Sequence, residues 1–428
     1  MKYAVVLLAL GCLVTTVHGQ WSEPICVGDS TGYSYPDFQI AAGGGDTLWA
    51  FYRGSDDYVF CRWSMGDSWS PEETLATRTW LLHWLSSGVD RRERVWLSWY
   101  DGNYLSLGDT WAIWTRVHDS LGWGTAHLAF PIYTGYGQTF ASDKDGNWHM
   151  GICRMNDAYP APFSSAYYAR FQGDTWAIGA LAIGSPDPDG VGYGLPTFVA
   201  RPDTGLWAVY SRRAYHEKDR VLIDHLVPFS SQVNFTVLYD LSWVAATGDS
   251  AGQMWIIYDD TMGGIWSLTY GTEGERDRRL VTADRRWGPV VCTDQMGWVW
   301  LFWAQSDTTL VASYNRGNGW SAPEVVTGTV GQPECIVSDQ HGRIYASFYD
   351  LHGRYWTCFR ISRPGINDAG SQARQRATRG ASVARSLPRG AVVFDAMGRR
   401  ALNSKPGVYF VREARAQSQA VQKVVITE

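Results

Sequence analysis

Three segments of the chain decide its fold: Asp249-Ser-Ala-Gly-Gln-Met-Trp255, Asp294-Gln-Met-Gly-Trp-Val-Trp300 and Asp339-Gln-His-Gly-Arg-Ile-Tyr345. They align without gaps as Asp-x-x-Gly-x-x-aromatic, and successive copies lie 45 residues apart. In each copy the aromatic residue opens an apolar run. An Asp carboxylate can cap a tight turn, and Gly supplies the positive φ that such a turn needs. Each segment therefore predicts a hairpin turn that leads into the second strand of a repeated unit.

Four looser copies of the pattern precede these three. Their aromatic residues are Trp49, Trp96, Trp148 and Trp207. From Trp49 to Trp255, the successive spacings are 47, 52, 59 and 48 residues. Seven copies across residues 21–361 give about 49 residues each, the size of a four-stranded propeller blade. We therefore predict an all-β, seven-bladed β-propeller over residues 20–365, with six blades as the alternative. The strand-opening Trp residues are expected to pack between blades. The element Trp21-Ser-Glu-Pro24 is expected to close the ring against the last blade and remove exposed strand edges.

Composition and charge agree with a large folded β protein. The 428 residues include 23 Trp and 23 Tyr, and only 18% are charged, which excludes intrinsic disorder and long coiled coils. Residues 366–428 hold eleven Lys or Arg and four acidic residues, a net of +7, so the total of −5 leaves −12 for the rest. A propeller this acidic should repel nucleic acid, and we predict no nucleic-acid partner.

The N-terminal residues 1–19 are typical of a secretory signal peptide, with Lys2 ahead of the apolar run 4–17. We predict that the chain is exported and has no transmembrane segment, because no other run approaches eighteen apolar residues. Six Cys follow the signal and none forms a Cys-x-x-Cys pair, so no zinc site is expected and no disulfide is assigned. No other metal or cofactor is predicted.

The C-terminal end carries a separate signal. After a linker predicted at 366–384, strand-like runs follow at 391–395, 407–411 and 422–426. The motifs Val393-Phe-Asp-x-x-Gly398-Arg399, Pro406-Gly-Val-Tyr-Phe-Val411 and Lys423-Val-Val-Ile426 resemble, in this order, the C-terminal sorting domain of type IX secretion cargo. The resemblance implies a small β-sandwich-like domain at 385–428, the type IX machinery as a partner, and release from a bacterial cell or attachment to its outer surface. The sorting signal it implies comprises Gly398, Gly407, Tyr409 and Lys423.

A second resemblance concerns the propeller. The segment Ser313-x-Asn315-x-Gly317-x-Gly319-Trp320 is similar to the Asp-box turn of sialidase-like propellers. The Asp-box is a folding motif, so the resemblance bears on fold rather than on chemistry. In a four-stranded blade, the first–second and third–fourth turns share one rim, here named the turn rim. The second–third turns and the loops between blades share the other, the loop rim, where the resemblance implies that ligands bind.

Candidate ligand-binding residues gather in the segments predicted for the loop rim. Arg together with Trp or Tyr provides forked donors and flat apolar platforms, which suits a sugar or a carboxylate. The candidates are Arg53, Asp57, Trp84, Tyr136, Arg154, Arg212, Asp259 and Arg354. If the protein is an enzyme, Asp57 or Asp56 falls nearest the acid position of the sialidase family. That family's Arg-Ile-Pro element is missing, so we predict no catalytic residue and no retained sialidase chemistry.

Three functions remain open from the sequence. The first is a non-catalytic extracellular recognition module that binds a glycan or a protein partner through the loop rim. The second is a glycoside hydrolase or lyase that uses two carboxylates, drawn from Asp56, Asp57, Asp259 and Asp260. The third is a structural protein of the envelope or surface.

Overall fold

A computed structural model describes most of the chain. The chain forms two compact units, and the boundary between them lies between Ser362 and Arg363. The described residues are 21–29, 37–44, 47–54, 58–65, 68–76, 83–102, 111–132, 136–142, 146–156, 163–172, 175–182, 191–201, 205–214, 219–227, 229–236, 241–249, 251–260, 264–271, 274–284, 287–328, 331–361, 382–384, 391–395, 407–413 and 421–426.

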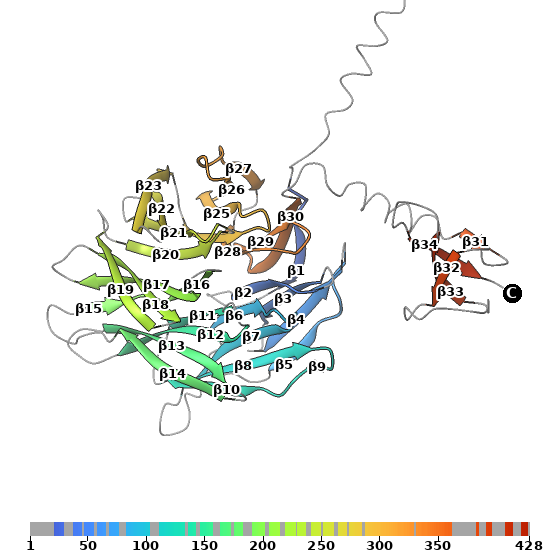
Figure 1. The fold of residues 1–428 in the computed structure, drawn as a ribbon, viewed down its shortest axis with the longest axis horizontal. Helices are drawn as coiled ribbons and strands as arrows, with labels where there is room; N and C mark the ends of the chain where they lie inside the picture. The colour runs from blue at the N-terminus through green and yellow to red at the C-terminus, as the bar shows by residue number, and fades with distance from the viewer. Residues whose placement is uncertain are drawn as a thin grey trace, which may run out of the picture. The chain divides into compact units, whose positions relative to one another are not determined.

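The first unit is a seven-bladed β-propeller, as predicted, and its blades follow the chain around a ring (Figure 1). Blade 1 consists of β2 (Phe38–Ala42), β3 (Leu48–Arg53), β4 (Val59–Ser64) and β5 (Glu73–Ala76). Blade 2 consists of β6 (His83–Val89), β7 (Val95–Gly102), β8 (Trp111–Asp119), β9 (Gly122–Trp123) and β10 (His127–Ile132). Blade 3 consists of β11 (Tyr136–Ser142), β12 (Trp148–Asn156), β13 (Phe163–Gln172) and β14 (Thr175–Ala182). Blade 4 consists of β15 (Val191–Tyr193), β16 (Thr197–Arg201), β17 (Gly205–Ala214), β18 (Arg220–Val227) and β19 (Phe229–Thr236). Blade 5 consists of β20 (Leu241–Gly248), β21 (Met254–Asp260), β22 (Ile265–Gly271) and β23 (Gly274–Thr282). Blade 6 consists of β24 (Trp287–Thr293), β25 (Val299–Ser306), β26 (Thr309–Asn315) and β27 (Glu324–Thr327). Blade 7 consists of β28 (Gly331–Ser338), β29 (Arg343–Asp350), β30 (Arg354–Ile361) and β1 (Ile25–Asp29).

The repeat that predicted the blades lies where it was expected. Each of the seven aromatic residues, from Trp49 to Tyr345, falls at or near the start of the second strand of its blade. The Gly of the three best copies adopts the predicted positive φ, near 75° at Gly252, Gly297 and Gly342. In blade 2 the same position is Glu93, which adopts a φ of 62° without being glycine.

The Asp of the repeat holds each turn closed by one recurring set of contacts, here named the Asp latch. In blade 6 the Oδ1 atom of Asp294 accepts hydrogen bonds from the backbone N–H groups of Met296 (2.8 Å) and Trp298 (3.0 Å). Its Oδ2 atom accepts a third from the indole Nε1 of Trp300, at 2.9 Å. The turns that start at Asp90, Asp249 and Asp339 repeat these contacts at residues i+2, i+4 and i+6.

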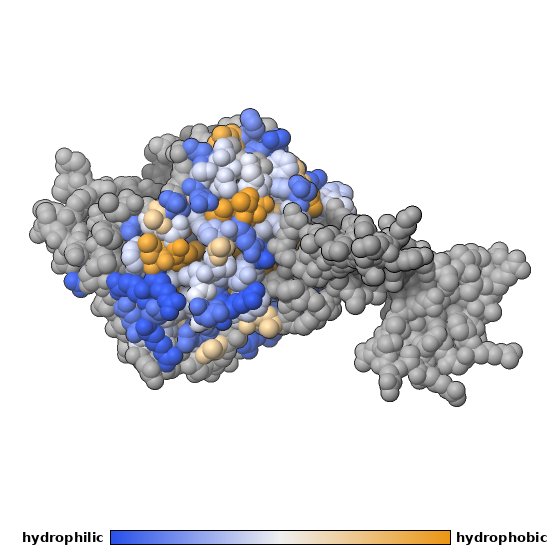
Figure 2. Space-filling model, turned by 90° about the horizontal axis from the view of Figure 1, so that it is seen from above, coloured by the Kyte–Doolittle hydropathy of each residue, from blue (hydrophilic) through white to orange (hydrophobic). Residues whose placement is uncertain are grey.

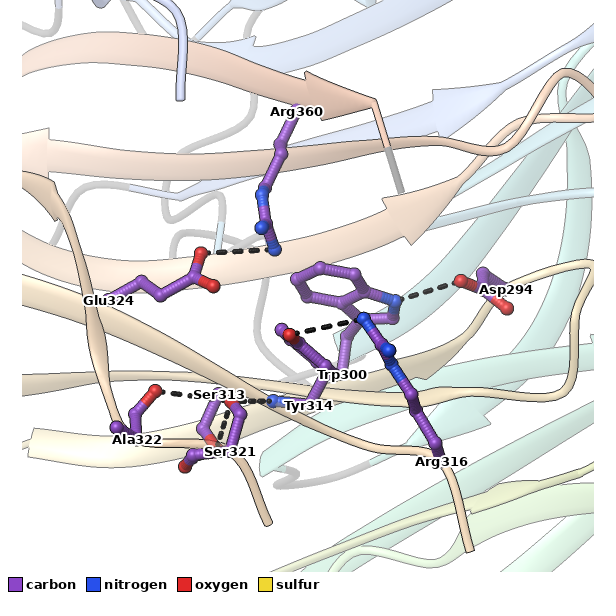
Figure 3. A network of polar contacts seen from close by, with 9 residues as sticks. All are labelled: Asp294, Trp300, Ser313, Tyr314, Arg316, Ser321, Ala322, Glu324 and Arg360. Atoms are coloured by element: carbon purple, nitrogen blue, oxygen red, sulfur yellow. Dashed lines mark hydrogen bonds and ion pairs between the residues drawn. The ribbon is translucent and has the colours of Figure 1, made fainter. Parts of the chain in front are cut away.

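The polar network around Trp300 shows how the latch of blade 6 connects to its own outer strand and to β30 of blade 7 (Figure 3). The indole lies between Asp294 and the guanidinium of Arg360, which is 5.0 Å from the ring and pairs with Glu324 at 3.0 Å. The neighbouring third–fourth turn is closed by Asn315, whose Oδ1 accepts from the N–H of Gly317 at 2.7 Å. The turn forms as expected, and its resemblance to an Asp-box stays a prediction.

The ring is closed by its first strand, as the segment Trp21-Ser-Glu-Pro24 predicted. Strand β1 pairs antiparallel with β30, so the two ends of the propeller complete blade 7 together. Ser22 strengthens the joint, because its backbone N–H donates to the carbonyl of Phe359 (2.8 Å) and its Oγ accepts from the N–H of Phe359 (3.0 Å).

The core of the described propeller consists of seven hydrophobic clusters, and each joins two neighbouring blades. One cluster packs Trp300 and Phe302 of blade 6 against Ile344 and Phe348 of blade 7, with Trp21 added from the N-terminal segment. The expectation that the strand-opening Trp residues pack between blades is confirmed by Trp96, Trp148 and Trp300, which are buried. None of the six Cys forms a disulfide.

The second unit contains one sheet with the strand order β31-β34-β33-β32. Its strands are β31 (Ser382–Ala384), β32 (Ala391–Asp395), β33 (Gly407–Glu413) and β34 (Val421–Ile426). The last three match the predicted strand runs. The short β31 falls inside the segment predicted as linker and pairs parallel with β34. Among the described residues of either unit, no helix is long and apolar enough to cross a membrane.

Candidate functional site

The inner strands of the propeller are irregular at the ends that begin on the loop rim. The pairing register with the second strand shifts near the start of β6, β11, β20, β24 and β28. A residue at such a bulge is released from the strand pairing, and its side chain can turn in a new direction. In β28 the register passes from Pro333–Phe348 to Cys335–Ser347, which leaves Glu334 as the bulged residue.

A cavity of about 520 Å³ lies where these irregular strand ends converge. The inner strands of blades 2 to 7 each contribute to its wall, through Ser86, Thr139, Phe198, Trp243, Val290 and Glu334. It also extends between blades 3 and 4, where Ser164 of blade 3 and Tyr193 of blade 4 line it. Its volume falls in the range of small-molecule sites, roughly 300–1,000 Å³.

Trp243 gives the cavity an exposed aromatic surface. Its side chain is 48% exposed, and among the Trp residues whose burial the structure describes only Trp63 is also exposed. Gly288, on the inner strand of the next blade, lies against it, since a Cβ atom there would be in ordinary van der Waals contact with the Trp243 ring, at 3.4 Å. The indole is therefore held against a neighbouring backbone with one side open to the cavity, as a sugar-stacking platform requires.

Glu334 is the charged residue of the described cavity wall. Burial raises the pKa of its carboxyl well above the usual range, and the negative charge of Asp37 raises it further. Both effects shift the balance toward the neutral carboxyl, and a cation bound beside it would shift the balance back toward the carboxylate.

Asp37 precedes β2 on the loop rim and acts on Glu334 through its charge. Its Oδ2 atom accepts a hydrogen bond from the backbone N–H of Trp84 at 3.0 Å. Burial raises the pKa of Asp37 to about 7, although that hydrogen bond and the charge of Arg53 both lower it. Trp84 adopts a φ of 51°, an uncommon conformation for a bulky side chain, and such strain is often found at functional sites.

Two amides and a phenol make further polar contacts near the two acids, outside the cavity wall. The hydroxyl of Tyr349 donates to Oε1 of Gln332, and the Nε2 of Gln138 donates to the carbonyl of Trp84. Burial raises the pKa of Tyr349, and the charges of Glu334 and Asp37 add to the rise. The phenol therefore stays protonated, and its proton is directed at Gln332.

The structure brings only part of the predicted site together. Arg53 and Trp84 both contact Asp37: Arg53 donates its backbone N–H to the Asp37 carbonyl (3.3 Å) and its side chain is 3% exposed. Tyr136 and Arg154 lie on β11 and β12, and their side chains are outside the described residues, as are Asp56 and Asp57 entirely. Arg212 lies on β17 and is partly buried.

Three further candidates on the loop rim lie within or beside turns. Asp259 is fully buried. Asp260 accepts hydrogen bonds from the N–H of Gly264 (2.8 Å) and the indole of Trp266 (2.7 Å). Asp350 makes the same contacts to Arg354 N–H (3.0 Å) and Trp356 (3.0 Å), and it forms an ion pair with the Arg354 guanidinium at 2.8 Å. These two turns are Asp latches on the loop rim, and the binding roles predicted for Asp259 and Arg354 stay predictions.

Sequence reasoning missed Asp37 and Glu334. One signal was available for Glu334, because an acidic residue between Pro333 and Cys335 interrupts a strand expected to be apolar. No signal in the sequence pointed to Asp37, because its hydrogen bond to Trp84 and its electrostatic effect on Glu334 both involve residues of other blades. In the described part of the chain, no three His, Cys, Asp or Glu side chains converge as metal ligands.

Large apolar side chains are also exposed outside the cavity. On the face shown in Figure 2, hydrophobic residues of the described part form small separate patches between hydrophilic ones. The large exposed apolar side chains, such as Leu121, Met65 and Leu351, lie on different strands and turns. Single exposed apolar residues of this kind are normal on a protein surface.

Comparisons with known proteins identify the fold and no family. No family model matches the chain, and no curated protein matches its sequence. Among solved structures, the BP39L lectin from Burkholderia pseudomallei aligns with a TM-score of 0.55 and 9% identity, over 79% of this chain and 98% of the lectin. This chain shares the propeller fold of that lectin. The Aleuria aurantia lectin aligns at 0.45 with 15% identity (71% and 98% covered), and the NanB sialidase from Streptococcus pneumoniae at 0.42 with 10% (79% and 70%).

Proposed function

We propose that the propeller is an extracellular carbohydrate-binding module whose binding site is the cavity at the loop rim. The observation that carries the proposal is the half-exposed indole of Trp243, which forms part of a wall that combines aromatic and aliphatic side chains with several Ser and Thr hydroxyls. A sugar needs this combination, because its apolar ring face stacks on an aromatic ring while its hydroxyl groups exchange hydrogen bonds. The shared fold with a lectin agrees with this function at the level of analogy.

The Trp243→Ala variant tests the proposal. A screen of immobilised glycans with the full-length protein first identifies a bound sugar. Trp243→Ala is then expected to weaken binding of that sugar about 10- to 100-fold, the usual effect of removing an aromatic anchor. Titration calorimetry measures the affinity, and thermal unfolding confirms that the variant folds.

Trp63→Ala is the matched control. Trp63 is 41% exposed on β4 and does not line the cavity. Its replacement is expected to leave the affinity within about twofold. Equal losses in both variants, or undiminished binding by Trp243→Ala, would exclude the cavity as the site.

A glycoside hydrolase is the second candidate, and the carboxyl pair Asp37 and Glu334 favours it. Two carboxyl groups can share acid and base roles when their environments separate their pKa values. Burial raises the pKa of both groups, to about 7 for Asp37 and well above the usual range for Glu334. The same glycan screen separates the candidates: sugar released over time that disappears in Glu334→Gln indicates hydrolysis, whereas stable binding without release indicates recognition.

We also propose that the chain is exported by the type IX route, with the second unit as the sorting domain. The order of the three C-terminal motifs and the match of β32, β33 and β34 to the predicted strand runs support this role. In a bacterium with type IX secretion, the full chain is expected outside the cell or on its surface. A chain without residues 391–428 is expected to accumulate in the periplasm. Immunoblots of cell fractions decide, and equal export of both chains would refute the role.

A further inference from the structure

We propose that the glycan bound in this cavity carries a free amino group, and that Glu334 is the residue that selects it. The inference rests on the proposed carbohydrate-binding function and adds the chemical class of the ligand.

The charges of the cavity favour a cation over an anion. Among the described residues, the wall contains one carboxyl group, Glu334, and no Lys, Arg or His. A sugar that carries a carboxylate, sulfate or phosphate would therefore bury its charge without a cationic partner, at a large cost in desolvation. The charge of Arg53 acts on Asp37, and Arg53 itself is only 3% exposed.

The bulge of β28 determines where the selecting group sits. Because Glu334 lies outside the register with β29, its carboxyl is offered to the cavity while Pro333 and Cys335 stay in the sheet. Asp37 does not line the cavity, but it is close enough for its charge to act on Glu334, so a second acidic group lies near the one in the wall. A bound ammonium group lowers the repulsion between them and forms charge-assisted hydrogen bonds, which are about twice as strong as neutral ones.

The aromatic part of the wall suits the same ligand. Trp243 and Tyr193 line the cavity together with Glu334. Indole and phenol rings attract cations over their faces as well as stack against sugar rings. One amino sugar can therefore use both halves of the wall, with its ring on an aromatic side chain and its ammonium group directed at the carboxyl.

The test compares oligomers of glucosamine with oligomers of N-acetylglucosamine of equal length, on the full-length protein. The wild type is expected to bind the glucosamine oligomer about 10- to 100-fold more tightly, as for a hydrogen bond between charged groups. Glu334→Gln keeps the shape of the side chain and removes its charge. It is expected to abolish this preference, chiefly by weakening the binding of the glucosamine oligomer.

Asp307→Asn is the matched control, because it removes an exposed carboxylate from the β25–β26 turn on the same rim. It is expected to retain the preference. Equal wild-type affinities for the two oligomers would overturn the inference and leave the proposed function standing. Failure of the wild type to bind any glycan would overturn the proposed function itself. A preference that survives in Glu334→Gln, or disappears in Asp307→Asn, would overturn the role of Glu334.

Discussion

A chain that starts at residue 30 is expected to be about 5 kcal/mol less stable than one that starts at residue 21. The shorter chain loses β1, and with it the backbone pairing to β30 and the buried side chains of Trp21 and Val27. Two buried apolar side chains contribute about 2–3 kcal/mol each, and the lost hydrogen bonds add about 1 kcal/mol each, less the entropy of ordering the strand. Urea denaturation of the two chains measures the difference.

The shorter chain is also expected to associate, because the edge of β30 becomes available to other strands. Size-exclusion chromatography should show oligomers that return to monomer when a synthetic peptide of residues 21–29 is added. The peptide then supplies the missing strand as an added edge. A monomer of unchanged stability without β1 would show that the closure contributes nothing to the ring.

Asp294→Ala is expected to lower the free energy of unfolding by about 3 kcal/mol. The substitution removes three hydrogen bonds at once and leaves the indole N–H of the fully buried Trp300 without its acceptor. A buried donor that loses its partner costs about 1–3 kcal/mol, and the turn loses its two backbone contacts in addition. Chemical denaturation followed by Trp fluorescence measures the loss.

Two substitutions test whether the latch is the cause. Asp294→Asn keeps an oxygen for the two backbone N–H groups but places an amide N–H opposite the indole N–H, so a loss of about 1.5 kcal/mol is expected. Asp307→Ala, at an exposed turn of the same blade, should change stability by less than about 0.5 kcal/mol. A similar loss at both positions would show that the latch of Asp294 has no special weight.

The fold could be predicted from the sequence because its signals are local. An Asp latch uses atoms within seven consecutive residues, so its spacing is visible in the chain, and a 45-residue period repeats it. The same pattern also occurs outside that period, in Asp350-Leu-His-Gly-Arg-Tyr-Trp356, where Arg354 was predicted as a ligand-binding residue of the loop rim. That segment repeats the folding motif, and its structure is a latch.

The site could be predicted only in part, because its signals are not local. Arg53 and Trp84 were expected from residue type and position on the loop rim, and both contact Asp37. Asp37 and Glu334 are almost 300 residues apart, and closing the ring is what brings their charges together. The strand bulges that aim Glu334 and Trp243 leave no clear pattern in the sequence, because they depend on how the inner strands meet around the axis.

The Asp latch also bears on how such a ring can arise and be rebuilt. Each latch is complete within its own hairpin and takes no atom from a neighbouring blade. A duplicated or transplanted blade therefore brings its turn geometry with it, whatever blade it is placed beside. Copying of blades and later divergence of their rims can proceed independently, which makes single blades the natural units for recombination and for grafting new ligand contacts.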